Sequence, residues 1–189
     1  MDIPVIPPRL RVGWLGAVSL ALAATLGAAP GIAEAPLVVA VKAVLLFNFA
    51  KFADWPALAA GDPIVFCVVG DDGVAAALVE TLHGQNIGGH ALNVSRPLIA
   101  TTWHVCHLLF IADAETHQAA PGLARVKTLP VLTISDGKGF SREDGIIELY
   151  MEGERMRFAI NVDAAERSGL HLSARLLTLA KIIRNADVR

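Results

Sequence analysis

Residues 64–72 read IVFCVVGDD, and this stretch decides the fold class. A continuous apolar run of six residues is typical of a strand buried on both faces, as in a parallel sheet. The glycine then permits a turn, and Asp71 and Asp72 can cap a helix over residues 74–82 that Gly84 ends. The stretch therefore predicts a strand, a tight turn and a helix in succession.

Further apolar runs with the same character follow along the chain. They lie at residues 105–111 (VCHLLFI) and 131–135 (VLTIS), and a shorter strand is expected over 92–96. The polar, Ala-rich stretch 113–127 separates two of these runs, although Pro121-Gly122 weakens it as a helix. This alternation predicts a single α/β domain with a mostly parallel sheet and flanking helices.

The pattern changes after residue 145. Apolar and polar residues alternate over 156–162, and residues 147–151 precede a polar turn, which together predict an antiparallel hairpin near the C-terminus. Asp163 with Glu166 resembles a capping box that begins a short helix.

A final helix is expected after Ser173, which is suited to cap it. Leu172, Leu176, Leu179 and Ile183 are spaced so that they would line one face of that helix. Such an apolar face would serve the core or a partner.

An apolar element spans residues 36–55 and ends before Pro56. Its Val-rich start is compatible with a strand, whereas residues 40–52 have the composition of a helix. Because this helix is apolar nearly all round, it is either buried on several sides or docked on a partner. Its aromatic residues are unusually dense, which leaves core packing and a contact surface as the two interpretations.

Residues 1–33 have the pattern of a secretory signal peptide, with domain 34–189 after it. Arg9 and Arg11 precede a charge-free apolar run, and small residues allow cleavage after Ala33. An uncleaved membrane anchor is the alternative. Export agrees with the two cysteines, Cys67 and Cys106, which would pair in an oxidising compartment or remain buried free thiols.

Several function classes find no support in the sequence. The formal net charge of −2 disfavours nucleic acid as a partner. Motifs for a serine nucleophile, a phosphate loop or a dinucleotide fold are absent. His104 and His107 would point to opposite faces of a strand, so they are poor joint metal ligands. We therefore expect no catalytic residues, no metal and no cofactor.

Six segments together resemble the YfiR/HmsC-like family of exported bacterial proteins. In order they cover about residues 40–182: VKAVLLFNFAKFADWP (41–56), FCVVGD (66–71), CHLLFI (106–111), PVLTISD with Gly139-Phe140 (130–140), GIIEL with RFAIN (145–161) and SGLHLSARLLTLA (168–180). Any one segment alone is a weak signal, whereas the opening motif together with the ordered set is fairly specific.

The resemblance implies a periplasmic regulator rather than an enzyme. Characterised members of the family bind the periplasmic part of an inner-membrane diguanylate cyclase and repress it, which lowers cyclic di-GMP and biofilm formation. An outer-membrane lipoprotein can sequester the repressor, and members form dimers. The positions of Cys67 and Cys106 match a disulfide of the family.

Two surfaces are the candidates for partner binding on this chain. The first is the aromatic set Phe49, Phe52 and Trp55, and the second is formed by Leu176 and Leu179 near the C-terminus. The alternative function is a small-molecule sensor whose ligand lies at the carboxyl edge of the sheet, near residues 70–73 and 136–139.

Overall fold

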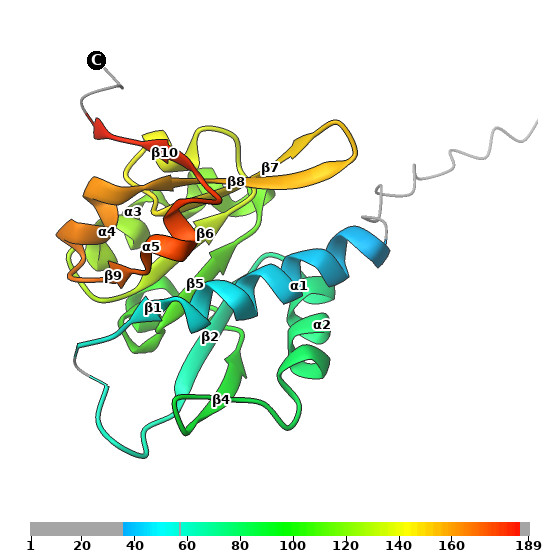
Figure 1. Cartoon of the computed structure of the whole chain (residues 1–189), viewed down its shortest axis with the longest axis vertical. Helices are drawn as coiled ribbons and strands as arrows, with labels where there is room; N and C mark the ends of the chain where they lie inside the picture. The colour runs from blue at the N-terminus through cyan, green and yellow to red at the C-terminus, as the bar shows by residue number, and fades with distance from the viewer. Residues whose placement is uncertain (1–35, 57, 186–189) are drawn as a thin grey trace, which may run out of the picture. The chain divides into compact units, whose positions relative to one another are not determined.

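The computed structural model describes residues 36–56 and 58–185 (Figure 1), which belong to one compact unit, Glu34–Arg189. The predicted signal peptide lies outside the described residues. The elements are, in chain order, α1 (Pro36–Lys51), β1 (Ala53–Asp54), β2 (Ile64–Val69), α2 (Asp72–Leu82), β3 (Asn86–Ile87), β4 (His90–Ser95), η1 (Ala100–Val105), β5 (Leu108–Ile111), η2 (Asp113–Glu115), α3 (Thr116–Val126), β6 (Leu132–Ser135), η3 (Phe140–Arg142), β7 (Ile147–Glu152), β8 (Arg155–Asn161), α4 (Val162–Arg167), β9 (His171–Leu172), α5 (Ala174–Leu177) and β10 (Lys181–Ile183).

The main sheet has eight strands in the order β10-β8-β7-β6-β5-β2-β4-β3. Strands β4, β2, β5, β6 and β7 are mutually parallel, whereas β7 and β8 form an antiparallel hairpin. The short β3 pairs antiparallel with β4, and β10 runs parallel to β8. The predicted α/β fold, with a mostly parallel sheet, flanking helices and a C-terminal hairpin, is confirmed.

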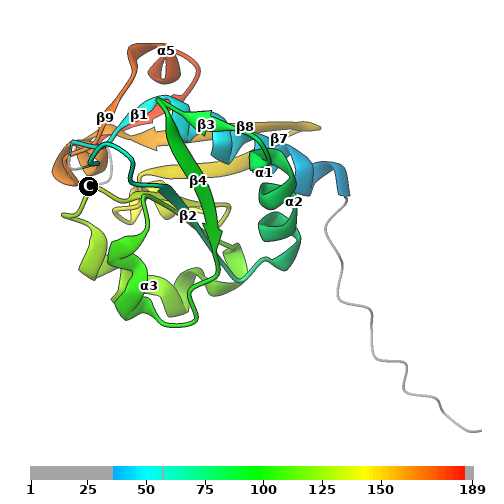
Figure 2. The ribbon, with the colours of Figure 1, turned by 90° about the horizontal axis from the view of Figure 1, so that it is seen from below.

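Both faces of the central strands are buried, which explains their continuous apolar sequences. Every residue of β5 and β6 is buried. Phe66, Leu108 and Phe110 lie in one core with residues of α1 and α2, while Leu109 and Ile111 lie in a second core with α3 residues. Figure 2 shows α3 on the opposite side of the sheet from α1 and α5. Strand β6 is the exception, because its sequence LTIS buries the hydroxyl groups of Thr133 and Ser135. The Thr133 hydroxyl accepts from the N–H of Ile146 at 3.1 Å, and the Ser135 hydroxyl accepts from the N–H of Gly137 at 2.9 Å.

Strands β7 and β8 differ because a helix layer covers only one of their faces. Leu149 pairs with Phe158, and Ile160 lies one pleat along; all three belong to the α1 core. Their neighbours, such as Tyr150 and Ala159, point to the other face, where the 136–145 loop with η3 forms the boundary. The alternating sequence of the hairpin follows from this one-sided burial.

Helix α1 confirms the predicted helix and extends it to Pro36, so the Val-rich start is helical. Proline is tolerated there because the first N–H groups of a helix have no partner within it. The helix buries one face, including Leu46 and the ammonium-bearing Lys42. Leu37 and Val44 stay exposed. Helix α1 is therefore apolar nearly all round because one face is buried in the core and the other face carries exposed apolar side chains.

The predicted long final helix is wrong. Helix α5 ends at Leu177, after one turn capped by Ser173 as expected. The chain then enters β10, where Ile183 pairs with Asn161 of β8. The β-branched residues at 182 and 183 favour a strand, and β8 offers an open edge for it. Leu172, Leu176, Leu179 and Ile183 therefore lie on β9, α5, a turn and β10 instead of on one helical face.

The start of α4 also differs from the prediction. The N-cap is Asn161, whose side chain accepts a hydrogen bond from the N–H of Ala164 at 2.9 Å. Asp163 accepts instead from the N–H of Asn185 at 2.8 Å. Asn161 is fully buried at the end of β8, where an amide is easier to bury than a carboxylate. In α3, the helix continues through Pro121-Gly122.

Candidate partner-binding surface

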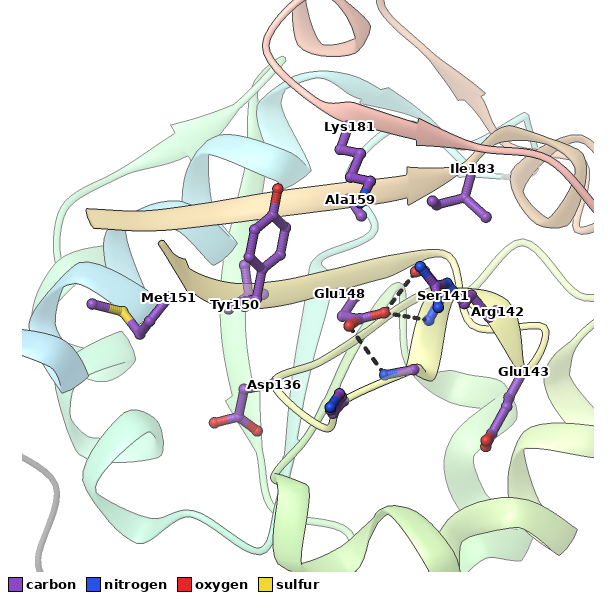
Figure 3. A pocket seen from close by; sticks show the side chains of 13 residues that line it. Asp136, Ser141, Arg142, Glu143, Glu148, Tyr150, Met151, Ala159, Lys181 and Ile183 are labelled. Atoms are coloured by element: carbon purple, nitrogen blue, oxygen red, sulfur yellow. Dashed lines mark hydrogen bonds between the residues drawn. The ribbon is translucent and has the colours of Figure 1, made fainter. Parts of the chain in front are cut away.

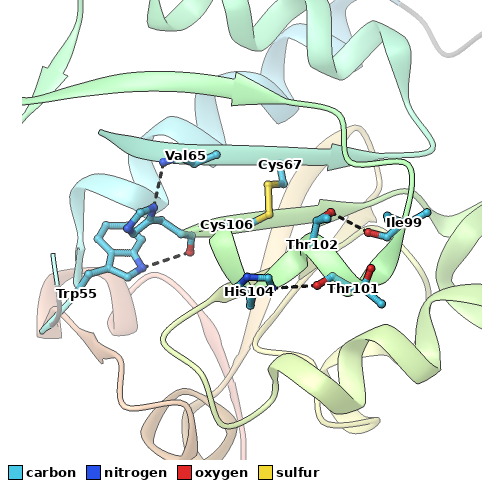
Figure 4. Close-up of a disulfide and its surroundings, with 9 residues drawn as sticks. Trp55, Val65, Cys67, Ile99, Thr101, Thr102, His104 and Cys106 are labelled. Atoms are coloured by element: carbon cyan, nitrogen blue, oxygen red, sulfur yellow. Dashed lines mark hydrogen bonds between the residues drawn. A yellow bond between two sulfur atoms is a disulfide. The ribbon is translucent and has the colours of Figure 1, made fainter. Parts of the chain in front are cut away.

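Trp55, at the end of the opening motif, is fixed against the strand that follows the second cysteine. Its indole N–H donates to the carbonyl oxygen of His107 at 3.2 Å (Figure 4). The two rings also meet edge to face, with centroids 5.9 Å apart. Trp55 is half-buried, so one part of its ring is held by the fold and another part faces solvent.

The surroundings of His107 favour its neutral form. The backbone N–H of Val65 donates to its Nδ1 at 3.1 Å, so the neutral ring carries its proton on Nε2. Burial lowers the pKa of His107, while the Asp62 carboxylate opposes this effect and His90 adds to it. A neutral imidazole therefore supports Trp55.

A disulfide anchors this arrangement to the central sheet. Cys67 on β2 is bonded to Cys106, with their Cα atoms 5.8 Å apart, and both side chains are buried. Cys106 directly precedes His107, so the bridge fixes the segment on which Trp55 rests (Figure 4). The predicted pairing is confirmed, and the free-thiol alternative is wrong.

A two-stranded ribbon brings the C-terminal segment against the end of α1. Ala53 of β1 pairs with Leu172 of β9, and the N–H of Ser173 donates to the carbonyl oxygen of Phe52 at 2.9 Å. Phe52 and Leu177 both pack against the α1 core. The two candidate surfaces, far apart in sequence, are therefore joined through this ribbon.

The structure separates the five candidate residues by exposure. Phe49 is 1% exposed and meets the Phe158 ring edge on at 5.0 Å, and Leu176 is 3% exposed, so both serve the core. Phe52 and Trp55 are half-buried. Leu179 is 67% exposed. Partner contact by any of the five stays a prediction, and the last three present the surface for it.

A small cavity lies beside Trp55, and we call it the Trp55 hollow. Its volume is about 230 Å³, and its lining residues are Trp55, Leu58, His104, Val105, Cys106, His107, Pro130 and Val131. Ligand pockets usually have volumes of about 300–1,000 Å³. The hollow is closer to the size of one inserted side chain. Sequence reasoning identified Trp55 but not Leu58 or His107, which reach it only through the fold.

A second group lies at the carboxyl edge of the sheet. Asp136, directly after β6, forms an ion pair with Lys42 of α1 and accepts from the N–H of Asp113 at 2.7 Å. Lys42 is only 3% exposed. Asp71 caps α2, as predicted, by accepting from the N–H of Val74 at 2.9 Å. The sequence carries no local signal for this ion pair, because α1 also contains Lys51 and the partner carboxylate lies 94 residues away from Lys42.

The predicted ligand edge is only half present. A cavity of about 730 Å³ includes Asp136 and Gly139 in its lining, but residues 70–73 do not contribute (Figure 3). His104 lies on η1 and not on a strand, and its Nδ1 contacts the carbonyl of Thr101 at 2.9 Å. Within residues 36–56 and 58–185, no group of His, Cys, Asp and Glu is arranged to hold a metal ion.

The YfiR/HmsC-like family model matches residues 39–181. The chain belongs to the YfiR/HmsC-like family. Membership supports a role as a periplasmic regulator, and the match spans the disulfide, the Trp55 hollow and the β1–β9 ribbon. In the part of this family member that the structure describes, no helix is long and apolar enough to cross a bilayer.

The chain is also similar, at low identity, to a solved structure. It is a conserved domain protein from Vibrio cholerae O1 biovar eltor, with a TM-score of 0.47 and 14% identity. The match covers 76% of this chain and 59% of that one, so the chain spans less than two thirds of that protein's length.

Proposed function

We propose that this protein acts in the periplasm, where it binds a membrane-bound diguanylate cyclase and represses it. Repression lowers cyclic di-GMP and biofilm formation. The observation that carries the proposal is the family match over residues 39–181, which includes the whole opening motif and both cysteines. The sequence offers no catalytic motif that would compete with a binding role.

The contact surface in this proposal runs from the Trp55 hollow across the β1–β9 ribbon to Leu179. Tryptophan is enriched among the residues that dominate binding energy at interfaces. The disulfide, the His107 contact and the ribbon hold Trp55 and Phe52 in place before binding, which reduces the entropy lost on association. Leu179 adds an exposed apolar residue beside this rigid surface.

Two further partners belong to the proposal. An outer-membrane lipoprotein would compete for the repressor and release the cyclase, and the repressor itself would act as a homodimer. Competition is simplest if the cyclase and the lipoprotein use overlapping parts of the same surface.

Deletion of the gene in the native host tests this function. We expect intracellular cyclic di-GMP and biofilm mass to rise, and the wild-type gene to restore both. The Leu179→Glu variant should fail to restore them, because it places a charge in the apolar contact. Unchanged cyclic di-GMP after deletion would contradict the proposal.

The matched control for this variant is Leu98→Glu. Leu98 is 98% exposed on the loop after β4, so the substitution has the same chemistry at a distant exposed position. It should restore repression fully. If both variants failed to restore repression at normal protein levels, the result would show that Leu179 is not part of the contact surface.

A further inference from the structure

The larger cavity lies on the face of the C-terminal strands that points away from α1. Its volume is about 730 Å³, within the usual range for small-molecule sites. Its charged lining residues are Asp136, Lys138, Arg142, Glu143, Glu148 and Lys181 (Figure 3). The Trp55 hollow shares none of these residues.

One wall of the cavity is fixed by Glu148 of β7. Its carboxylate accepts from the N–H of Gly139 at 3.0 Å, the N–H of Ser141 at 3.1 Å and the hydroxyl of Ser141 at 2.7 Å. These three bonds tie the 136–145 loop to the sheet, as Figure 3 shows. The three donors are neutral, so they hold the Glu148 carboxylate in place but leave it with its negative charge.

A second carboxylate in the lining, that of Asp136, is paired with a cation of the protein. Asp136 is paired with the buried Lys42 and accepts the N–H of Asp113. Glu143 and Glu148 are the remaining acidic residues of the lining. The cavity therefore has two acidic side chains left to oppose its cations.

Three cations line the cavity and form no ion pair within the described residues: Lys138, Arg142 and Lys181. They come from the loop after β6, from η3 and from β10. Glu143 and Glu148 stand against these three cations, so the lining keeps an excess of one positive charge when Asp136 and Lys42 are counted as a pair. Positive charge lining a hollow raises the local concentration of anions.

The floor of the cavity is less polar than this rim. Tyr150, Ala159 and Ile183 come from three adjacent strands and share one face of the sheet, because Tyr150 and Ala159 lie on the outward pleat and Ile183 pairs beside Asn161. In Figure 3, the side chain of Lys181 extends from β10 toward Ala159, over this floor. A cationic rim above an aromatic and aliphatic floor suits a ligand that has an anionic group and an apolar body.

We propose that this cavity binds a small organic anion. The apolar body of the ligand lies against Tyr150, Ala159 and Ile183, and its carboxylate or phosphate group lies among Lys138, Arg142 and Lys181. This site does not depend on the proposed partner-binding function, because it lies on the other face of the sheet from α1 and uses different residues. A ligand there would act as a signal on the regulator.

Nuclear magnetic resonance titration with simple probes tests this site. Benzoate and phenyl phosphate supply the two anionic groups, and benzamide is the neutral counterpart of benzoate. We expect both anions to shift the amide signals of Lys138, Gly139, Tyr150 and Lys181. Benzamide should bind at least about tenfold more weakly, since one charge-assisted contact is worth about that factor.

Charge-removing variants identify the residues responsible. The double variant Arg142→Gln with Lys181→Gln should weaken benzoate binding by about tenfold or more. Its matched control is Arg175→Gln with Lys127→Gln, which removes one exposed Arg and one exposed Lys that do not line the cavity. The control should bind benzoate as the wild type does, and both variants should keep the wild-type amide spectrum away from the substitutions.

Four results would overturn the proposal. They are equal binding of benzamide and benzoate, equal weakening by the control variant, shifts centred on Trp55 and Leu58 in place of the cavity, and no shift at about 10 mM probe. A greater effect of phenyl phosphate than of benzoate would support the proposal and assign the anion as a phosphate. The opposite order would support it and assign a carboxylate.

Discussion

The two halves of the main sheet differ in how they are covered. Strands β2, β5 and β6 lie between α1 and α2 on one face and α3 on the other, and they are almost wholly buried. Strands β7 and β8 pack against α1 on one face, and their residues alternate in burial over the first four residues of each strand, whereas Ala159, Ile160 and Asn161 at the end of β8 are all buried. The same sheet therefore has one half with helices packed on both faces and another half with one face that borders the larger cavity.

Each proposed site follows from this difference. The Trp55 hollow lies where the doubly covered half meets solvent, directly beside the disulfide. The larger cavity lies over the half that has one free face. A perturbation of the first half should cost stability, whereas a perturbation of the free face should cost binding.

Removal of the disulfide should produce the largest effect on stability. Cys67 and Cys106 are 39 residues apart, so the chain-entropy model gives a loss of about 4 kcal/mol in the free energy of unfolding for the Cys67→Ala, Cys106→Ala variant. Urea denaturation measures this loss. Wild-type protein with reductant should lose a similar amount, and a loss below about 1 kcal/mol would contradict a stability role for the doubly covered half.

Adjacent residues on β7 provide the most direct comparison of the two faces. Leu149 is buried in the α1 core, so Leu149→Ala should cost about 3 kcal/mol. Tyr150 faces the cavity, so Tyr150→Ala should cost at most about 1 kcal/mol and should weaken benzoate binding. Urea denaturation of both variants checks this. Equal losses of stability would show that the outer face is as tightly packed as the inner one.

A third prediction concerns the packing of α3 on the doubly covered half. A Cβ on Gly122 would lie 2.5 Å from Cζ3 of Trp103 and 2.7 Å from the Cβ of Ala100. Gly122→Ala should therefore destabilise the protein by about 2 kcal/mol through overpacking, despite its better helix propensity. Thermal denaturation measures the change.

The control for this helix substitution is Gly73→Ala in α2. A Cβ there would lie 3.3 Å from Oδ1 of Asp71 and 3.6 Å from a methyl group of Val39. Both neighbours are side-chain ends, so the change should be neutral or slightly stabilising. If Gly122→Ala and Gly73→Ala destabilised the protein to the same degree, the cause would be the replacement of glycine in a helix and not the contact with Trp103.

The smallest expected effect is a pH dependence that belongs to His107. Its pKa is lowered by burial, so as the pH falls below about 6.5 the unfolded chain takes up a proton before the folded protein does. The free energy of unfolding should then decrease from pH 7.5 to pH 5.5. His107→Asn keeps an acceptor for the N–H of Val65 and removes the titrating group.

The measurement is urea denaturation of wild type and His107→Asn at both pH values. The variant should lose less stability on acidification than the wild type. An identical pH dependence in the two proteins would assign the effect to other groups.

The positions of the central strands along the chain and their burial could be predicted from the sequence, because continuous apolar runs are a local signal of burial on both faces. The alternation over 156–162 likewise indicated the hairpin. The β1–β9 ribbon could not be predicted, since each strand has two residues and the pairing joins Ala53 to Leu172. Strand β10 was mistaken for helix because its apolar spacing fits both structures.

The candidate site was predicted in part for the same physical reason. Aromatic density identified Trp55 and Phe52, but the burial of Phe49 and Leu176 depends on contacts with Phe158 and the α1 core. The Lys42–Asp136 pair and the cationic rim join segments distant in sequence. No local pattern carries such information.

Site-specific photo-crosslinking in the native host tests the central claim most directly. A photoreactive residue replaces Leu179 in one protein and Leu98 in the other, and crosslinked membranes are solubilised and analysed by mass spectrometry. We predict that position 179 captures a membrane protein with a cyclase output domain and that position 98 does not. Capture of only the protein itself from position 179, at good crosslinking yield, would contradict the account.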